Sequence, residues 1–214
     1  TYLSRVPEDK NQKTESYWAT LKIKKCIKGE EINGNFGLNV NGTVKYFRES
    51  DKDDFLGLLW RLIASKATSI AGEYFDLVPI PGHKIVGIDT VGFRNLEYAK
   101  AIAAACNGRG MARHCLFWET EQEPQRGSTG HRSWRDRYEP MRVGTPSERP
   151  VILFDDILTS GSTLVAAKKR LEEAGAKVIG AVVVTRAVHD EPPAINWREL
   201  ELEEHDLFSM FFSM

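Results

Sequence analysis

The chain has 214 residues, of which 42% are hydrophobic and 28% are charged, and its formal net charge at pH 7 is −1. This composition is typical of a globular protein with one large domain, or with one domain and an appendage. The balanced charge indicates no general attraction to nucleic acid, and the lack of any run of about 18 apolar residues predicts no membrane span. The cysteines lack the spacing of a metal site or a redox pair, which favours a reducing cytoplasm; they are Cys26, Cys106 and Cys115.

Residues 1–65 are expected to form a small antiparallel β region followed by a helix, packed on the core as an appendage. Apolar and polar residues alternate over Trp18–Ile27, which is the period of a half-buried strand. A second alternating stretch, residues 35–48, is interrupted by Asn41-Gly42, a dipeptide typical of a two-residue hairpin turn. The apolar residues of 51–65 recur at helical spacing and predict a helix.

The core is expected over residues 66–190, where apolar strands alternate with helical segments. Strands are predicted at 74–81, 111–118, 151–156 and 177–186. Helices are predicted at 94–105 and 164–174. Strands that alternate with helices predict right-handed crossovers. The fold class is therefore α/β, with a mostly parallel, doubly wound sheet and an N-terminal antiparallel β appendage.

Two segments lack a regular period. Residues 119–150 are polar and rich in arginine, and a long irregular loop inside an α/β domain is usually functional or disordered. The tail, residues 191–214, is acidic in its middle and ends in an apolar run of Phe and Met. Because an exposed apolar tail would promote aggregation, it is expected to dock on this chain or on a partner.

Residues 151–163 join a buried strand, two acids and a small turn. Asp155 and Asp156 follow four apolar residues, at the carboxyl end of the strand, where open α/β sheets bind ligands. The turn before the next helix is rich in hydroxyl groups: Thr159, Ser160, Gly161, Ser162 and Thr163. A helix N-terminus suits a phosphate, and carboxylates accept hydrogen bonds from a diol, so the segment predicts a ribose 5-phosphate site. The alternative is a plain turn with an aspartate as helix cap, which accounts for one acid but not two.

This segment resembles the motif by which type I phosphoribosyltransferases bind 5-phosphoribosyl 1-pyrophosphate (PRPP). The run 78–84, with Gly92–Asn95, looks most like the ComF-type branch, although the order of residues 91–95 departs from that branch. The resemblance implies that Asp155 and Asp156 hold the ribose hydroxyls, and Mg²⁺ through water or PRPP. It also implies that Thr159–Thr163 cradle the 5-phosphate.

The resemblance further implies a pyrophosphate site on the loop after the 74–81 strand. Gly82, His83 and Lys84 would contact pyrophosphate, with Lys84 as a point charge. A mobile loop of the family delivers a closing basic residue, for which the candidates here are Arg126, Arg132 and Arg135. For His83 the alternative is a role in the turn alone, and for each arginine it is a place in a solvated charged loop.

The implied activity is the transfer of a phosphoribosyl group to a nitrogen base, with Mg²⁺ and with release of pyrophosphate. Asp155, Asp156, Lys84 and Arg126 are the implied catalytic residues. Dimers are common in the family, so a homodimer is one arrangement that would cover the tail. Two alternatives stay open: a regulator that binds PRPP or a nucleotide without turnover, and a nucleotide-modifying effector in a bacterial defence or toxin system.

Overall fold

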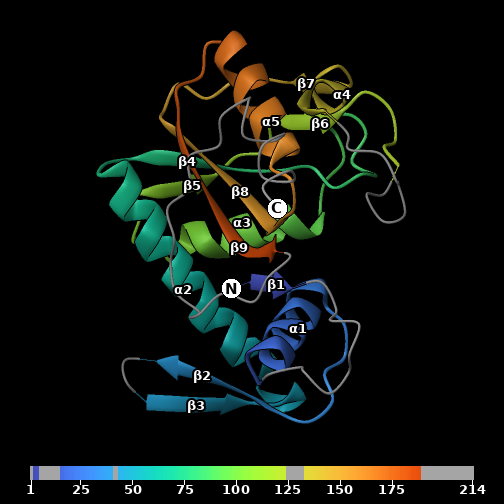
Figure 1. The fold of residues 1–214 in the computed structure, drawn as a ribbon. Coiled ribbons are helices and arrows are strands. Elements are labelled where there is room, and N and C mark those ends of the chain that lie inside the picture. The colour runs from blue at the N-terminus through green and yellow to red at the C-terminus, as the bar shows by residue number, and fades with distance from the viewer. Residues whose placement is uncertain (1, 5–14, 41–42, 124–132, 189–214) are drawn as a thin grey trace, which may run out of the picture. The chain divides into compact units, whose positions relative to one another are not determined.

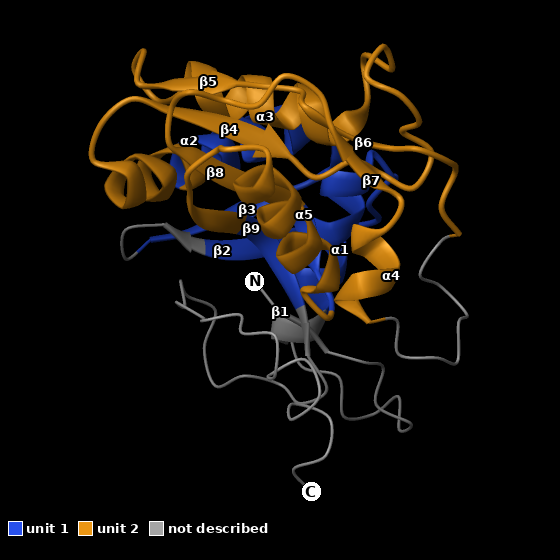
Figure 2. Ribbon diagram, turned by 90° about the horizontal axis from the view of Figure 1, so that it is seen from above, with its two compact units in different colours: residues 1–62, 156–159, 183–199 blue, residues 63–155, 160–182, 200–214 orange. Residues whose placement is uncertain are grey.

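The computed structural model describes residues 2–4, 15–40, 43–123 and 133–188 (Figure 1). They fall into two compact units, drawn in different colours in Figure 2. The described part of one unit lies within residues 2–62, 156–159 and 183–188, and that of the other within 63–155 and 160–182. In these ranges no helix has both the length and the apolar character that a bilayer crossing requires.

A five-stranded sheet carries the central part of the chain, in the order β1-β9-β8-β4-β5 (Figure 1). The strands are β1 (Tyr2–Ser4), β4 (Phe75–Pro79), β5 (Gly110–Ala112), β8 (Val151–Leu158) and β9 (Val178–Val188). The pairs β1–β9, β4–β5 and β4–β8 are parallel. The predicted α/β fold with a mostly parallel sheet is thereby confirmed, while β1 was not predicted.

The register of β4 and β8 brings their carboxyl ends to the same edge of the sheet. Pro79 lies opposite Phe154, and the N–H of Ile80 donates to the carbonyl of Phe154 at 2.8 Å. Every residue of β4 is buried, as are the first four of β8, which explains why both strands are mostly apolar; the buried Asp76 of β4 is the exception among them. Helix α3 (Arg94–Ala104) follows β4 in the chain, and helix α5 (Ser162–Glu173) follows β8.

The N-terminal hairpin is confirmed: β2 (Phe36–Val40) pairs antiparallel with β3 (Thr43–Phe47). A short 3₁₀ turn (Glu49–Asp51) and helix α2 (Lys52–Ala71) come next. Phe55 of α2 packs edge-on against Phe36 and Phe47, with ring centroids 5.1 and 5.4 Å apart, and the three rings are buried. This aromatic cluster stabilises the hairpin, because a two-stranded sheet is marginal without packing against another element.

The strand predicted at Trp18–Ile27 is wrong, because these residues belong to helix α1 (Glu15–Lys28). Their buried apolar side chains are Ala19, Ile23, Cys26 and Ile27, which is the i, i+4, i+7, i+8 pattern of a helix face. The alternation of Leu21 to Lys24 suggested a period of two, but it covers only a short part of the element.

The single strand predicted at 111–118 is also wrong, because the chain divides there between two sheets. After β5, the guanidinium of Arg113 pairs with the buried carboxylate of Asp76, Nε to Oδ2 at 3.2 Å. The chain then enters β6 (Leu116–Trp118), which pairs antiparallel with β7 (Met141–Val143). Helix α4 (Trp134–Tyr138) lies in the segment predicted to be irregular. The tail, 191–214, lies outside the described residues.

Candidate functional site

The turn between β8 and α5 has the geometry of an anion-binding helix start. Gly161 precedes the helix with φ +77°, a left-handed conformation that glycine adopts without strain. The Oγ of Ser160 lies 2.9 Å from the Oγ of Ser162 and accepts from the N–H of Ser162 at 3.4 Å. The first turn of α5 contains no acidic residue, so its positive dipole end is not neutralised within the helix. The N-cap position of α5 is Gly161, so the residue at this position has no side chain with which to cap the helix.

Asp155, in the second half of β8, is held by a residue that the sequence did not identify. The Nδ2 of Asn95, in the first turn of α3, donates to Asp155 Oδ1 and to the carbonyl of Ile80, each at 3.2 Å. Asn95 is only 7% exposed, and its Oδ1 has no hydrogen-bond partner among the described residues. The amide therefore joins the ends of β4 and β8 and fixes the position of the half-buried Asp155.

Asp156 lies in a different environment. β8 continues past both aspartates to Leu158, so their side chains leave the strand toward opposite faces. Asp156 is 8% exposed, and its carbonyl accepts a hydrogen bond from Thr185 Oγ1 of β9 at 3.3 Å. The strand predicted at 151–156 therefore extends to Leu158, and the two acids lie in its second half on opposite faces and not at its end.

The loop after β4 is fixed through its carbonyl groups. The indole N–H of Trp118 donates to the carbonyls of Pro81 and Gly82, at 3.2 and 3.0 Å. The N–H of Gln122 donates to the carbonyl of His83 at 2.8 Å. The backbone is held by Trp118 and Gln122, and the side chains of His83 and Lys84 are exposed.

Among the three candidate closing arginines, only Arg135 lies in the described residues; Arg126 and Arg132 lie outside them. Arg135 is exposed on α4, with its guanidinium 5.5 Å from the ring centroid of Trp134. Helix α4 is attached to α5 by Arg170, whose Nε donates to the carbonyl of Tyr138 at 3.0 Å and whose guanidinium covers the Tyr138 ring. In this structure Arg135 thus belongs to the α4–α5 surface.

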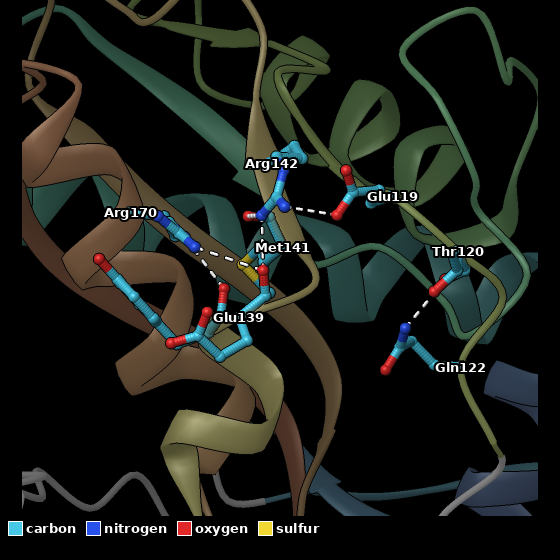
Figure 3. A network of polar contacts seen from close by, with 8 residues as sticks. Glu119, Thr120, Gln122, Glu139, Met141, Arg142 and Arg170 are labelled. Carbon is cyan, nitrogen blue, oxygen red and sulfur yellow. Dashed lines mark hydrogen bonds and ion pairs between the residues drawn. The ribbon is translucent and has the colours of Figure 1, made fainter.

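A polar network joins these elements to the base of the β6–β7 hairpin (Figure 3). Arg142 of β7 pairs with Glu119, which directly follows β6. Arg170 of α5 donates from Nη2 to the carbonyl of Glu139 at 3.3 Å. The pair of Glu119 and Arg142 therefore fixes the two ends of the segment between β6 and β7 to each other. The contact of Arg170 with Glu139 fixes this segment to α5.

Two neighbouring titratable groups after β5, the half-buried His114 and the buried Cys115, have shifted pKa values. Burial lowers the pKa of His114 below its usual value, and a hydrogen bond with the backbone of Leu116 opposes that shift. The imidazole packs edge-on against Phe93, with ring centroids 4.9 Å apart. Burial raises the pKa of Cys115 to about 11. His114 therefore offers no cation near neutral pH, and Cys115 offers no thiolate nucleophile.

The comparison with protein families decides what kind of domain this is. Residues 62–210 match the family described as Phosphoribosyl transferase domain. The chain belongs to this family. The β8–α5 segment and the loop after β4 both lie inside the matched range, as the phosphoribosyl transferase resemblance requires. No curated protein matches the chain.

Solved structures of phosphoribosyltransferases resemble the chain at low identity. Orotate phosphoribosyltransferase from Aeropyrum pernix is 13% identical, with 79% of this chain and 92% of that chain covered and a TM-score of 0.42. Adenine phosphoribosyltransferase from Saccharomyces cerevisiae is 14% identical, with coverages of 78% and 89% and a TM-score of 0.40. A hypoxanthine phosphoribosyltransferase from Staphylococcus aureus is 12% identical, with coverages of 66% and 71% and a TM-score of 0.37. These scores decide nothing about the substrate of this chain.

Replacing Gly161 tests the turn, and Gly175 provides a matched control. Both glycines have a positive φ, +77° and +91°, and Gly175 lies after the far end of α5 with open space around it. Each change to alanine is expected to lower the free energy of unfolding by about 1–2 kcal/mol, the cost of a left-handed alanine. Only Gly161→Ala should also weaken ribose 5-phosphate binding, measured calorimetrically. Equal affinity in the two variants would contradict a phosphate role for this turn.

Replacing Asn95 tests its role as a link between the two strand ends. Asn95→Ala leaves the buried Ile80 carbonyl and the Asp155 carboxylate without this donor. The free energy of unfolding, measured in urea, should fall by about 1–3 kcal/mol. Asn33→Ala, at an exposed position, is the control and should stay within about 0.5 kcal/mol of wild type. Equal free energies of unfolding for Asn95→Ala and Asn33→Ala would contradict a stabilising role for the Asn95 hydrogen bonds.

Proposed function

We propose that the protein transfers the 5-phosphoribosyl group of PRPP to a nitrogen base and releases pyrophosphate. The observation that carries this proposal is the β8–α5 segment. Two consecutive acids lie in the second half of its strand, a left-handed glycine precedes its helix, and the first turn of that helix contains no acid. Membership of the phosphoribosyl transferase family supports the same conclusion independently.

The 5-phosphate is proposed to bind at the start of α5. The N–H groups of the first helical turn have no acceptor within the helix, and the dipole favours an anion there. The hydroxyls of Ser160 and Ser162 lie at this turn and can donate, with those of Thr159 and Thr163 as further candidates. Gly161 lets the backbone approach the phosphate closely.

The ribose hydroxyls are proposed to bind the carboxylates of Asp155 and Asp156. Asp155 is already positioned by Asn95, so little side-chain entropy is lost when it accepts a hydroxyl. The Oδ1 of Asn95, buried and without a partner among the described residues, is a further acceptor beside Asp155.

Mg²⁺ fits this donor set. The cation commonly uses one or two carboxylates together with substrate phosphates and water. Among the described residues, no three His, Cys, Asp or Glu side chains gather into a metal site; Asp155 and Asp156 are consecutive in the chain but lie on opposite faces of β8, so each would reach the cation separately. The proposed holders are these two acids, through water or PRPP. When bound, the cation offsets negative charge on pyrophosphate.

The pyrophosphate is proposed to bind the loop after β4. Gly82 permits a close backbone approach, and the exposed His83 and Lys84 side chains offer a donor and a positive charge. A closing basic residue is proposed among Arg126, Arg132 and Arg135. Such a residue would exclude water from PRPP, which otherwise hydrolyses.

The proposed reaction needs no covalent intermediate on the protein. The bond from the anomeric carbon to the pyrophosphate oxygen breaks, and its electron pair leaves with pyrophosphate. A ring nitrogen of the base uses its lone pair to form the new carbon–nitrogen bond, and the proton of that nitrogen passes to solvent. The transition state resembles an oxocarbenium ion, so positioning and stabilisation of the leaving group supply the rate enhancement.

The ComF-type branch is the finer assignment that we propose. Its support is the proline-rich end of β4 followed by Gly82, His83 and Lys84, and the Gly92–Asn95 run before and at the start of α3. The acceptor is proposed to be a nitrogenous base, since the reaction requires a nitrogen nucleophile.

The two aspartates provide the test of binding. Asp155→Asn combined with Asp156→Asn should reduce PRPP affinity in the presence of Mg²⁺ by at least about 100-fold, measured calorimetrically, because both charged acceptors are lost. The matched control is Asp53→Asn with Asp54→Asn, a neighbouring and exposed pair in the first turn of α2. Wild-type affinity in the 155/156 variant rejects the site.

Turnover is tested by incubating wild-type protein with PRPP, Mg²⁺ and a panel of purine and pyrimidine bases. Pyrophosphate release that depends on one base supports the enzyme. PRPP binding without release on any base overturns the transfer reaction and leaves a PRPP-binding regulator.

A further inference from the structure

Trp118 of β6 contacts the loop after β4 on both sides of His83 and Lys84. Its indole Nε1 donates to the carbonyls of Pro81 and Gly82, at 3.2 and 3.0 Å. Its backbone N–H donates to the carbonyl of Ile85 at 2.9 Å, and its own carbonyl accepts from the N–H of Gly87 at 3.1 Å. One residue, only 2% exposed, thus makes four hydrogen bonds to the segment 81–87.

The chain after Trp118 completes the support. Gln122 donates from its backbone to the carbonyl of His83 at 2.8 Å. The three consecutive carbonyls from Pro81 to His83 therefore all accept from residues 118–122. These hydrogen bonds restrain the backbone of the loop. The side chains of His83 and Lys84 are exposed.

Trp118 is itself held in place. The guanidinium of the buried Arg137 lies 6.0 Å from the centroid of its ring. Trp118 pairs with Met141 across the β6–β7 ladder, and the next residue, Glu119, is paired with Arg142 (Figure 3). Trp118 consequently connects the loop after β4 to the β6–β7 pair. Residues 119–140, which include the candidate closing arginines, connect β6 to β7 in the chain.

We propose that Trp118 is a positioning residue for a diphosphate group bound by the loop after β4. The inference rests on the proposed function and specifies one half of its site. A rigid, preorganised backbone lowers the cost of binding an anion, because the loop is not ordered at the moment of binding. Trp118 acts through the backbone of residues 81–83 and does not itself contact the ligand.

The proposal predicts a split between two ligands. Trp118→Phe keeps an aromatic ring but removes the indole N–H, so the Pro81 carbonyl loses this donor and the Gly82 carbonyl keeps only the N–H of Ile85, at 2.9 Å. The affinity for inorganic pyrophosphate with Mg²⁺ should fall about tenfold, the size of one to two neutral hydrogen bonds. The affinity for ribose 5-phosphate, which is proposed to bind at the start of α5, should stay within about twofold.

Trp134→Phe is the matched control, because Trp134 is another tryptophan of the same unit and packs on α4 and α5. It should leave both affinities unchanged. A merely structural role for Trp118 predicts equal losses for pyrophosphate and ribose 5-phosphate, or no loss for either, and each of these results overturns the inference.

A measurement on the wild-type protein keeps the inference testable if Trp118→Phe does not fold. In the nitrogen-15 NMR spectrum, the indole N–H signal of Trp118 should shift when pyrophosphate with Mg²⁺ is added and should stay unchanged with ribose 5-phosphate. A signal that responds to neither ligand, while pyrophosphate binds, overturns the positioning role. If wild-type protein binds neither ligand nor PRPP, the proposed function itself is wrong, and this inference falls with it.

Discussion

The parallel pairing of β4 with β8 is the constraint on which the rest of the structure depends. Because Pro79, the last residue of β4, lies opposite Phe154, the chain that leaves β4 begins beside Asp155 of β8. The N–H of Ile80 donates to the carbonyl of Phe154, and the Asn95 amide joins the Ile80 carbonyl to the Asp155 carboxylate. A one-residue slip of this register would turn every side chain of a strand to the other face. The start of the loop after β4 is thus fixed to β8 beside Asp155.

Local signals predicted the elements that carry the proposed chemistry. β4 and the first half of β8 are buried, so their sequences are mostly apolar, and the turn before α5 is marked by Gly161 among hydroxyl residues. The hairpin was predictable from its alternation and from Asn41-Gly42. Hydrophobic periodicity gave the wrong element at Trp18–Ile27, where a short alternating run lies within a helix. It also gave a single strand at 111–118, where the chain passes from one sheet to another and Arg113 pairs with Asp76.

The supporting residues could not be predicted, because their roles depend on partners far away in the chain. Asn95 reaches Asp155 across 60 positions, and Trp118 reaches Gly82 across 36. Neither has a motif of its own: one is an amide in the first turn of a helix, and the other is a buried aromatic residue in a short strand. Both hold backbone or carboxylate groups of the proposed site, which shows that the motif residues and the residues that position them carry different sequence signals.

The central claim is that the β8–α5 turn binds the phosphate of a ribose 5-phosphate unit. A crystal structure of the chain with ribose 5-phosphate bound tests it most directly. The account predicts the phosphate at the backbone N–H groups of residues 161–163 and the ribose diol against Asp155. A sugar phosphate bound elsewhere on the chain, with this turn unchanged and unliganded, would contradict the account.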